Sequence, residues 1–121
     1  MGVEIVRTYE DPGRTAGEHR VLVDRLWPRG MAKAAVDYDE WLKDVAPSEA
    51  LRRFYGHEPA RFEEFARRYR AELGAPPAAA EVERLRALAR AGTLVLLTAT
   101  RDVDRSGAAV LRAVLEERPH R

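Results

Sequence analysis

The residues of this sequence best suited to chemistry are Asp24, Arg25 and Arg29, which follow directly on an apolar, β-branched run. Such a run is typical of a strand buried on both faces, and the proline and glycine that come next predict its end. Ligands of open α/β sheets bind beyond the carboxyl ends of the strands. Arginine side chains suit phosphate or carboxylate, and Asp24 could act as a base or orient an arginine. We therefore expect an anion site at this strand end.

Two further places carry residue types that could join this site. His57 lies in a Gly-His-Glu-Pro corner between two expected helices, where an imidazole can serve as acid or base. Arg101 and Asp102 come one residue after the apolar run 93–99. Both apolar runs are typical of central strands, so we expect them to be adjacent and parallel. The charged residues at their ends would then line one crevice.

These places together define a candidate site with two roles. Asp24 and His57 are the catalytic candidates, and Trp27 would form a wall of the pocket. The expected ligand-binding residues are Arg25, Trp27, Arg29, Gly30, Arg101 and Asp102. An alternative interpretation gives the same residues structural roles, as an Asp–Arg pair beside a buried tryptophan and as helix caps. We also expect Trp27 and Trp41 to be largely buried, since each lies among apolar residues.

The composition indicates one globular domain spanning residues 1–121. Its 21 Lys and Arg nearly balance 20 Asp and Glu, which argues against a dedicated nucleic-acid or membrane binder. The absence of cysteine excludes disulfides and thiol nucleophiles. Neither a signal peptide nor a membrane-spanning run is recognisable, so a cytoplasmic location is expected.

The sequence offers no pattern for a metal ion or a cofactor. The histidines His19, His57 and His120 lack the spacing of metal ligands. A phosphate-binding Walker loop, a dinucleotide glycine fingerprint and a serine-nucleophile elbow are all absent. We therefore expect no metal and no cofactor, and these patterns leave open whether the protein is an enzyme.

The order of elements predicts an α/β fold with a small, mostly parallel sheet of three to four strands flanked by helices. Strands are expected at 3–8, 20–26 and 93–99, with a helical insertion between the second and the last strand. The helices are expected to begin at Asp37, Ser48, Pro59 and Pro76, and a final helix at Asp104 or Ser106.

Several motifs carry a resemblance to a known family: the decapeptide Val-Leu-Val-Asp-Arg-Leu-Trp-Pro-Arg-Gly at 21–30, Trp-Leu-Lys-Asp at 41–44, Ala-Pro-Ser at 46–48, Leu-Arg at 51–52, Gly-His-Glu-Pro at 56–59 and the helix 62–73. With these, the sequence resembles the YeaO-like branch of the domain-of-unknown-function family 488 (DUF488), from about residue 3 to residue 116. The resemblance implies a small cytoplasmic bacterial or archaeal protein with an α/β fold.

One stretch departs from the pattern of this branch, which typically reads Ala-(Arg or Lys)-Asp-x-x-His-Asn-x-Ala after the last strand. Arg101 and Asp102 match it, but Arg105 replaces the histidine and Ser106 replaces the asparagine. The resemblance therefore implies binding of the family's ligand without the same turnover, or a diverged paralogue.

Two functions follow from these residues. The first is a crevice that binds a small anionic ligand, phosphate- or nucleotide-like, with or without chemistry on it. The alternative is a non-catalytic binding or interaction module in which the motif residues form a structural ion-pair network.

Overall fold

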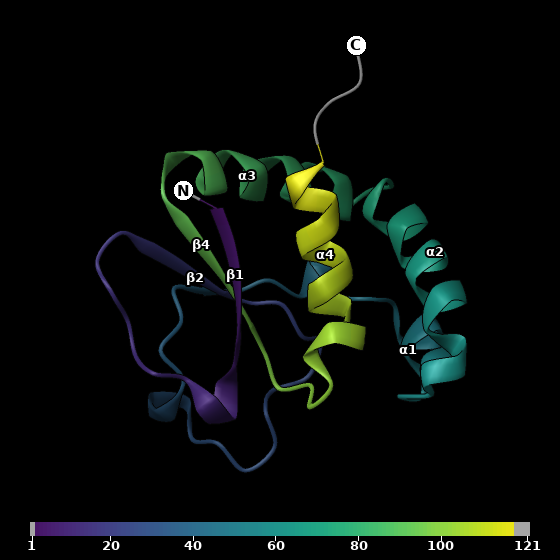
Figure 1. The fold of residues 1–121 in the computed structure, drawn as a ribbon, viewed down its shortest axis with the longest axis horizontal. Helices are drawn as coiled ribbons and strands as arrows, with labels where there is room; N and C mark the ends of the chain where they lie inside the picture. Colours follow the sequence, from purple (N-terminus) through teal and green to yellow (C-terminus); the bar gives the residue numbers. More distant parts are fainter. Residues whose placement is uncertain (1, 118–121) are drawn as a thin grey trace.

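The fold is built on a four-stranded, all-parallel sheet with the strand order β1-β4-β2-β3 (Figure 1). The computed structural model describes residues 2–117. The strands are β1 (Gly2–Arg7), β2 (Glu18–Leu22), β3 (Glu40–Trp41) and β4 (Thr93–Thr98). This confirms the α/β fold and the adjacency of the two apolar strands, since β2 pairs in parallel with β4.

The central strand β4 is buried on both faces, and its side chains alternate between two cores. Leu94 and Leu96 pack into the larger core, and Val95 and Leu97 pack into the smaller one. This alternation follows from the two-residue period of a strand. A continuous apolar run is therefore what a strand in this position needs.

All four α-helices contribute to the larger core, so they cover the same face of the sheet (Figure 1). They are α1 (Glu49–Tyr55), α2 (Phe62–Leu73), α3 (Ala78–Ala91) and α4 (Gly107–Glu116). Ser48 caps α1 as predicted, because its hydroxyl accepts a hydrogen bond from the backbone N–H of Leu51 at 3.2 Å.

The opposite face of the sheet carries the smaller core and is covered by connecting segments. Its buried residues belong to β2, β4 and the segment 23–39, with Trp27, Met31 and Tyr38 packed against them. Within residues 2–117, none of the α-helices contributes a residue to this core. This face is called the helix-free face below.

Two predicted elements differ from the observed ones. The second strand ends at Leu22 rather than at residue 26, although the N–H of Val23 still donates to the Leu97 carbonyl at 3.1 Å. The helix predicted to begin at Asp37 does not form. The chain is extended there because it pairs with the edge of β2. The backbone N–H of Asp39 donates to the Arg20 carbonyl, and the backbone N–H of Arg20 donates to the Asp39 carboxylate, both at 2.7 Å.

In the described part of the chain, every helix is too short or too polar to cross a membrane.

Candidate functional site

A cavity of about 790 Å³ opens beyond the carboxyl ends of β1, β2 and β4, bordered by α1 and the start of α4. Three strand ends meet there because parallel strands place their carboxyl ends at one edge of the sheet. Every residue of the predicted site except Gly30 lines this cavity: Asp24, Arg25, Trp27, Arg29, His57, Arg101 and Asp102. Gly30 instead lies in a turn with a φ of 81°, a left-handed conformation that favours glycine.

Asp24 is anchored to the end of β4. Its carboxylate accepts hydrogen bonds from the Thr98 hydroxyl and from the backbone N–H of Ala99, both at 2.7 Å. Burial raises the pKa of Asp24 above its ordinary value of 3.8, and the bonds from Ala99 and Thr98 oppose that rise. Among residues 2–117, Asp24 forms no ion pair with any basic side chain. The cavity therefore contains a carboxylate held without a cation.

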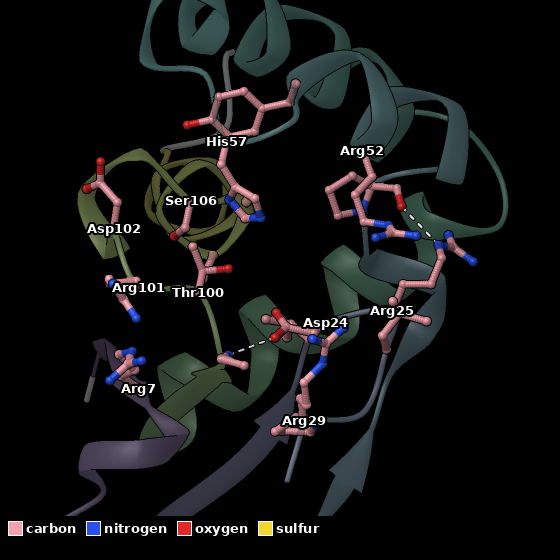
Figure 2. Close-up of a pocket in the computed structure, with 18 of the residues that line it drawn as sticks. Arg7, Asp24, Arg25, Arg29, Arg52, His57, Thr100, Arg101, Asp102 and Ser106 are labelled. Carbon is pink, nitrogen blue, oxygen red and sulfur yellow. Dashed lines mark hydrogen bonds between the residues drawn. The ribbon is translucent and has the colours of Figure 1, made fainter.

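Arg25 extends away from Asp24 toward the segment before α1 (Figure 2). Its Nε donates to the carbonyl of Pro47 at 3.0 Å, and one terminal nitrogen lies 3.5 Å from the carbonyl of Ala46. The guanidinium group therefore links the segment after β2 to the segment before α1. The ion pair between Asp24 and Arg25 that a structural network would need does not form.

Three other arginines of the cavity keep their charge unpaired. Arg29, Arg52 and Arg101 are exposed, and their side chains form no hydrogen bond or ion pair with the residues that the structure describes. Figure 2 shows them on different sides of the cavity. An unpaired guanidinium group is free to bind a carboxylate or phosphate through parallel hydrogen bonds.

Arg7 is a cavity residue that sequence reasoning missed. It is the last residue of β1, its guanidinium group lies 4.8 Å from the centre of the Tyr9 ring, and it is 3.5 Å from Glu10. Its Nε is buried and has no hydrogen-bond partner among residues 2–117. The strand-end rule that identified Asp24 could have found it, because Arg7 is the last residue but one of the first predicted strand, 3–8. Arg52, by contrast, lies on a helix and gives no such signal.

His57 lies at the rim of the cavity in a left-handed backbone conformation. Its φ is 57°, directly after Gly56 with a φ of 51°, which ends α1. Figure 2 shows its ring directed into the cavity, on the side of Ser106. A non-glycine residue in this region of φ costs about 1–3 kcal/mol, and such strain is concentrated at functional sites.

The two positions that depart from the family's pattern have structural partners. The Arg105 side chain pairs with Asp102 at 3.2 Å, and Arg105 does not line the cavity. Ser106 caps α4, since its hydroxyl accepts from the N–H of Ala109 at 3.1 Å and donates to the carbonyl of Val103 at 2.6 Å. Neither side chain replaces the missing imidazole.

The two tryptophans are half-buried. Their rings pack edge to face, with centroids 5.5 Å apart, on the helix-free face. The indole N–H of Trp27 donates to the Met31 carbonyl at 2.6 Å, and that of Trp41 donates to the Asp24 carbonyl at 2.7 Å. Part of each ring stays in contact with solvent, and the ammonium group of Lys43 lies 4.2 Å from the centre of the Trp41 ring.

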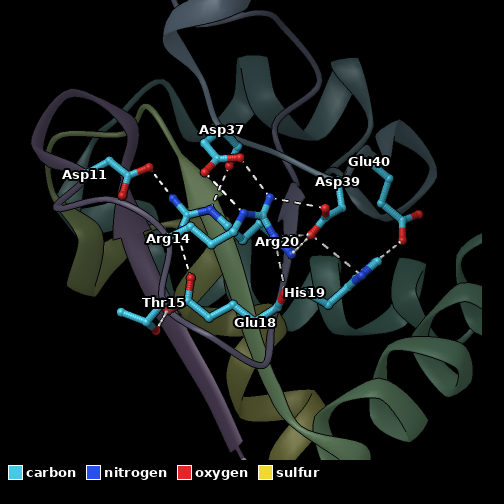
Figure 3. Close-up of polar contacts among 9 residues, drawn as sticks. All are labelled: Asp11, Arg14, Thr15, Glu18, His19, Arg20, Asp37, Asp39 and Glu40. Atoms are coloured by element: carbon cyan, nitrogen blue, oxygen red, sulfur yellow. Dashed lines mark hydrogen bonds and ion pairs between the residues drawn. The ribbon is translucent and has the colours of Figure 1, made fainter.

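A second cluster of charges lies on the helix-free face, outside the cavity (Figure 3). At its centre is Arg20, with a side chain that is 1% exposed. The Arg20 side chain donates to Asp11, to Glu18 at 2.7 Å and to the Asp37 carbonyl at 2.7 Å. Arg14 covers it and pairs with the Asp37 carboxylate at 2.8 Å. This cluster attaches the connections on either side of β2 to the sheet.

Metal-ligating side chains are not grouped in the part of the chain that the structure describes. His19 contacts Glu40 at 2.6 Å and Asp39 at 3.8 Å, and His57 lies elsewhere at the cavity rim. His120 lies outside the described residues.

The fold and the cavity define a small, parallel α/β protein with an arginine-lined pocket at the carboxyl edge of its sheet. The chain belongs to the family described as the inactive DUF488-N3 subclade, whose model matches residues 2–121, and this confirms the resemblance. An uncharacterized protein of Mycobacterium tuberculosis is 48% identical over 116 residues, which cover 96% of this chain and 95% of that protein. The uncharacterized protein YeaO of Escherichia coli is 36% identical over 111 residues, which cover 92% and 94%. No solved structure matches the chain.

Proposed function

We propose that this protein binds a small, phosphate-bearing anion in the cavity and does not turn it over. The observation that carries the proposal is the set of unpaired guanidinium groups of Arg29, Arg52 and Arg101 around one cavity. Five arginines line this cavity against two aspartates, so its charge favours an anion. The cavity volume of about 790 Å³ is also in the usual range for small-molecule sites.

The start of α4 adds to this preference. Gly107 and Ala108, the first two residues of the helix, line the cavity. The backbone N–H groups of a helical first turn lack partners within the helix and carry a partial positive charge. These groups support anion binding together with the arginines.

Absence of turnover is supported by the residues that replace the family's histidine and asparagine. The Arg105 side chain is paired with Asp102, and the Ser106 hydroxyl is used to cap α4. Binding without chemistry also agrees with the description of the subclade as inactive. The alternative, a structural ion-pair network within the motif, has less support, since Asp24 and Arg25 have no ionic partner among residues 2–117.

The proposal includes a cytoplasmic location and excludes nucleic acid as the principal partner. The relatives are bacterial proteins, and the net charge of +1 gives no general attraction to polyanions.

The test is calorimetric titration of the full chain with phosphorylated metabolites, compared with Arg52→Gln, Arg101→Gln and a matched control. The control is Arg53→Gln, because Arg53 adjoins Arg52 on α1 but pairs with Glu49 at 2.5 Å and lies outside the cavity. Loss of one charged hydrogen-bonding group should weaken binding about ten- to a hundredfold for Arg52→Gln and Arg101→Gln. Equal weakening by Arg53→Gln, or no binding by the unmodified protein, would contradict the proposal.

A further inference from the structure

Asp24 has acceptor capacity that no described residue uses. Each of its carboxylate oxygens accepts one hydrogen bond at 2.7 Å, from Thr98 on one side and from Ala99 on the other. An ionised carboxylate can accept about four hydrogen bonds in total. Since both protein donors belong to the end of β4 and Asp24 also lines the cavity, the group is fixed in place with acceptor positions left for a ligand.

The ligand group that meets Asp24 must be a neutral hydrogen-bond donor. A buried carboxylate without further partners is unfavourable, so a donor from the ligand stabilises it. A ligand cation is disfavoured because five arginines line the same cavity and repel it. Hydroxyl groups satisfy both conditions.

Within the ligand, the hydrogen-bond donor must also be close to the anionic group, because the Asp24 carboxylate and the guanidinium groups share one cavity. A ribose phosphate meets this requirement, since its vicinal hydroxyls lie on the same small ring system that carries the phosphate ester. The use of an aspartate to bind ribose hydroxyls at the carboxyl edge of a parallel sheet has a physical precedent in dinucleotide sites.

We propose that Asp24 accepts hydrogen bonds from the vicinal hydroxyls of the ligand, so that the cavity selects a ribose phosphate over a simple phosphate. This inference rests on the proposed function and specifies its ligand. Two sources share this chemistry, a free sugar phosphate and a nucleotide. Tyr9, Leu26 and Trp27 line the cavity and offer an apolar surface that a nucleobase could contact.

The experiment titrates the intact chain with ribose 5-phosphate, 2-deoxyribose 5-phosphate, AMP, 2′-deoxy-AMP and inorganic phosphate. We expect the dissociation constant of each ribose compound to be at least about tenfold lower than that of its deoxy counterpart. This is the effect of losing one hydrogen bond to a charged group. Tighter binding of AMP than of ribose 5-phosphate identifies a nucleotide, and the reverse order identifies a free sugar phosphate.

Asp24→Asn should reduce this discrimination to less than about twofold, because the side-chain amide is uncharged and has one acceptor oxygen where the carboxylate has two. Asp104→Asn is the control, since Asp104 is exposed and lies outside the cavity, so this variant makes the same change of charge away from the lining residues. Thermal melting checks that each variant is folded, and the comparison of ribose with deoxyribose in the unmodified protein needs no variant.

Equal binding of all five compounds would overturn the role of Asp24 and leave the anion site standing. Equal loss of discrimination in Asp104→Asn would also overturn it. Failure of every phosphate compound to bind would instead remove the proposed function, and this inference with it.

Discussion

The guanidinium group of Arg25 donates to the carbonyl of Pro47 at 3.0 Å, although Asp24 is its neighbour in the chain and lines the same cavity. This contact joins the end of one strand to the start of a helix 22 residues further along the chain. It also leaves the Asp24 carboxylate without a counter-ion among residues 2–117. Arg25 therefore holds the wall of the cavity, and this is the arrangement on which the proposed role of Asp24 depends.

Arg25→Ala should lower the free energy of unfolding by about 1.5–3 kcal/mol, the range for hydrogen bonds that involve a charged group. The loss should stay below the roughly 3–5 kcal/mol of a broken buried ion pair, because no carboxylate loses its partner. Urea unfolding measures the change. A loss above that range would show that Arg25 compensates an acidic group after all.

Arg20→Met should be much more damaging, because Arg20 is the buried cation of the helix-free face. Removal of its charge leaves Asp11 and Glu18, whose side chains are 16% and 9% exposed, without the cation that they contact. We expect a loss of about 3–5 kcal/mol in the free energy of unfolding, as for one partner removed from a buried pair.

Arg14→Met is the matched control for Arg20→Met in the same urea series. Arg14 pairs with Asp37 and Asp39 from the surface, where ion pairs contribute little. The control should therefore lose much less stability than Arg20→Met. Equal losses would mean that burial of Arg20 is not what makes the cluster important.

The pH dependence of Asp24 should be opposite in sign to that of a typical surface carboxylate. Its pKa is raised in the folded protein by burial, so folding favours the protonated form. The contribution of Asp24 to stability is fully present below the pKa that it has in the unfolded chain. This contribution is lost as the pH rises through the pKa that Asp24 has in the folded protein. The stability of the unmodified protein relative to Asp24→Asn should therefore fall over that window, which begins near the ordinary value of 3.8.

Asp37 provides the internal comparison for this titration. Hydrogen bonding from Arg14 lowers the pKa of Asp37, so its contribution is present above the unfolded pKa and is lost as pH falls through the folded pKa. Carboxyl NMR titration should place Asp37 below and Asp24 above 3.8, the ordinary value for both. The reverse order would contradict the assigned environments.

His57→Gly should be more stable than His57→Ala by about 1 kcal/mol, because glycine adopts a left-handed conformation without a steric cost. Both variants remove the imidazole, so the difference between their stabilities measures only the backbone strain at residue 57. Differential scanning calorimetry of the pair measures it. If the alanine variant is equally stable, the backbone at residue 57 is not strained.

The sequence was most informative where one physical rule sufficed. Apolar runs bounded by turn residues located β2 and β4, and the strand-end rule then located Asp24 and Arg101 in one cavity. The same rule applied to the first strand would have added Arg7.

The failures came from contacts between distant parts of the chain. Asp37 followed by Glu40 has the pattern of a helix cap, but pairing with β2 made this segment extended. The direction of the Arg25 side chain depends on the carbonyl of Pro47. Arg52 lines the cavity because of how α1 packs on the sheet. Local sequence patterns contain no record of these contacts.

The one-sided placement of the helices has a consequence for motion. The connection 23–39 packs on the helix-free face, and the connection 8–17 contacts it through Asp11 and Arg14. Neither has α-helical hydrogen bonds, so their amides should exchange with solvent through local openings well before the helical side does. Both connections also form a wall of the cavity, where the Tyr9 hydroxyl donates to the Arg29 carbonyl at 2.6 Å. We therefore expect the segments that open most readily to be walls of the cavity, so that a bound ligand should slow their exchange without affecting α2 or α3.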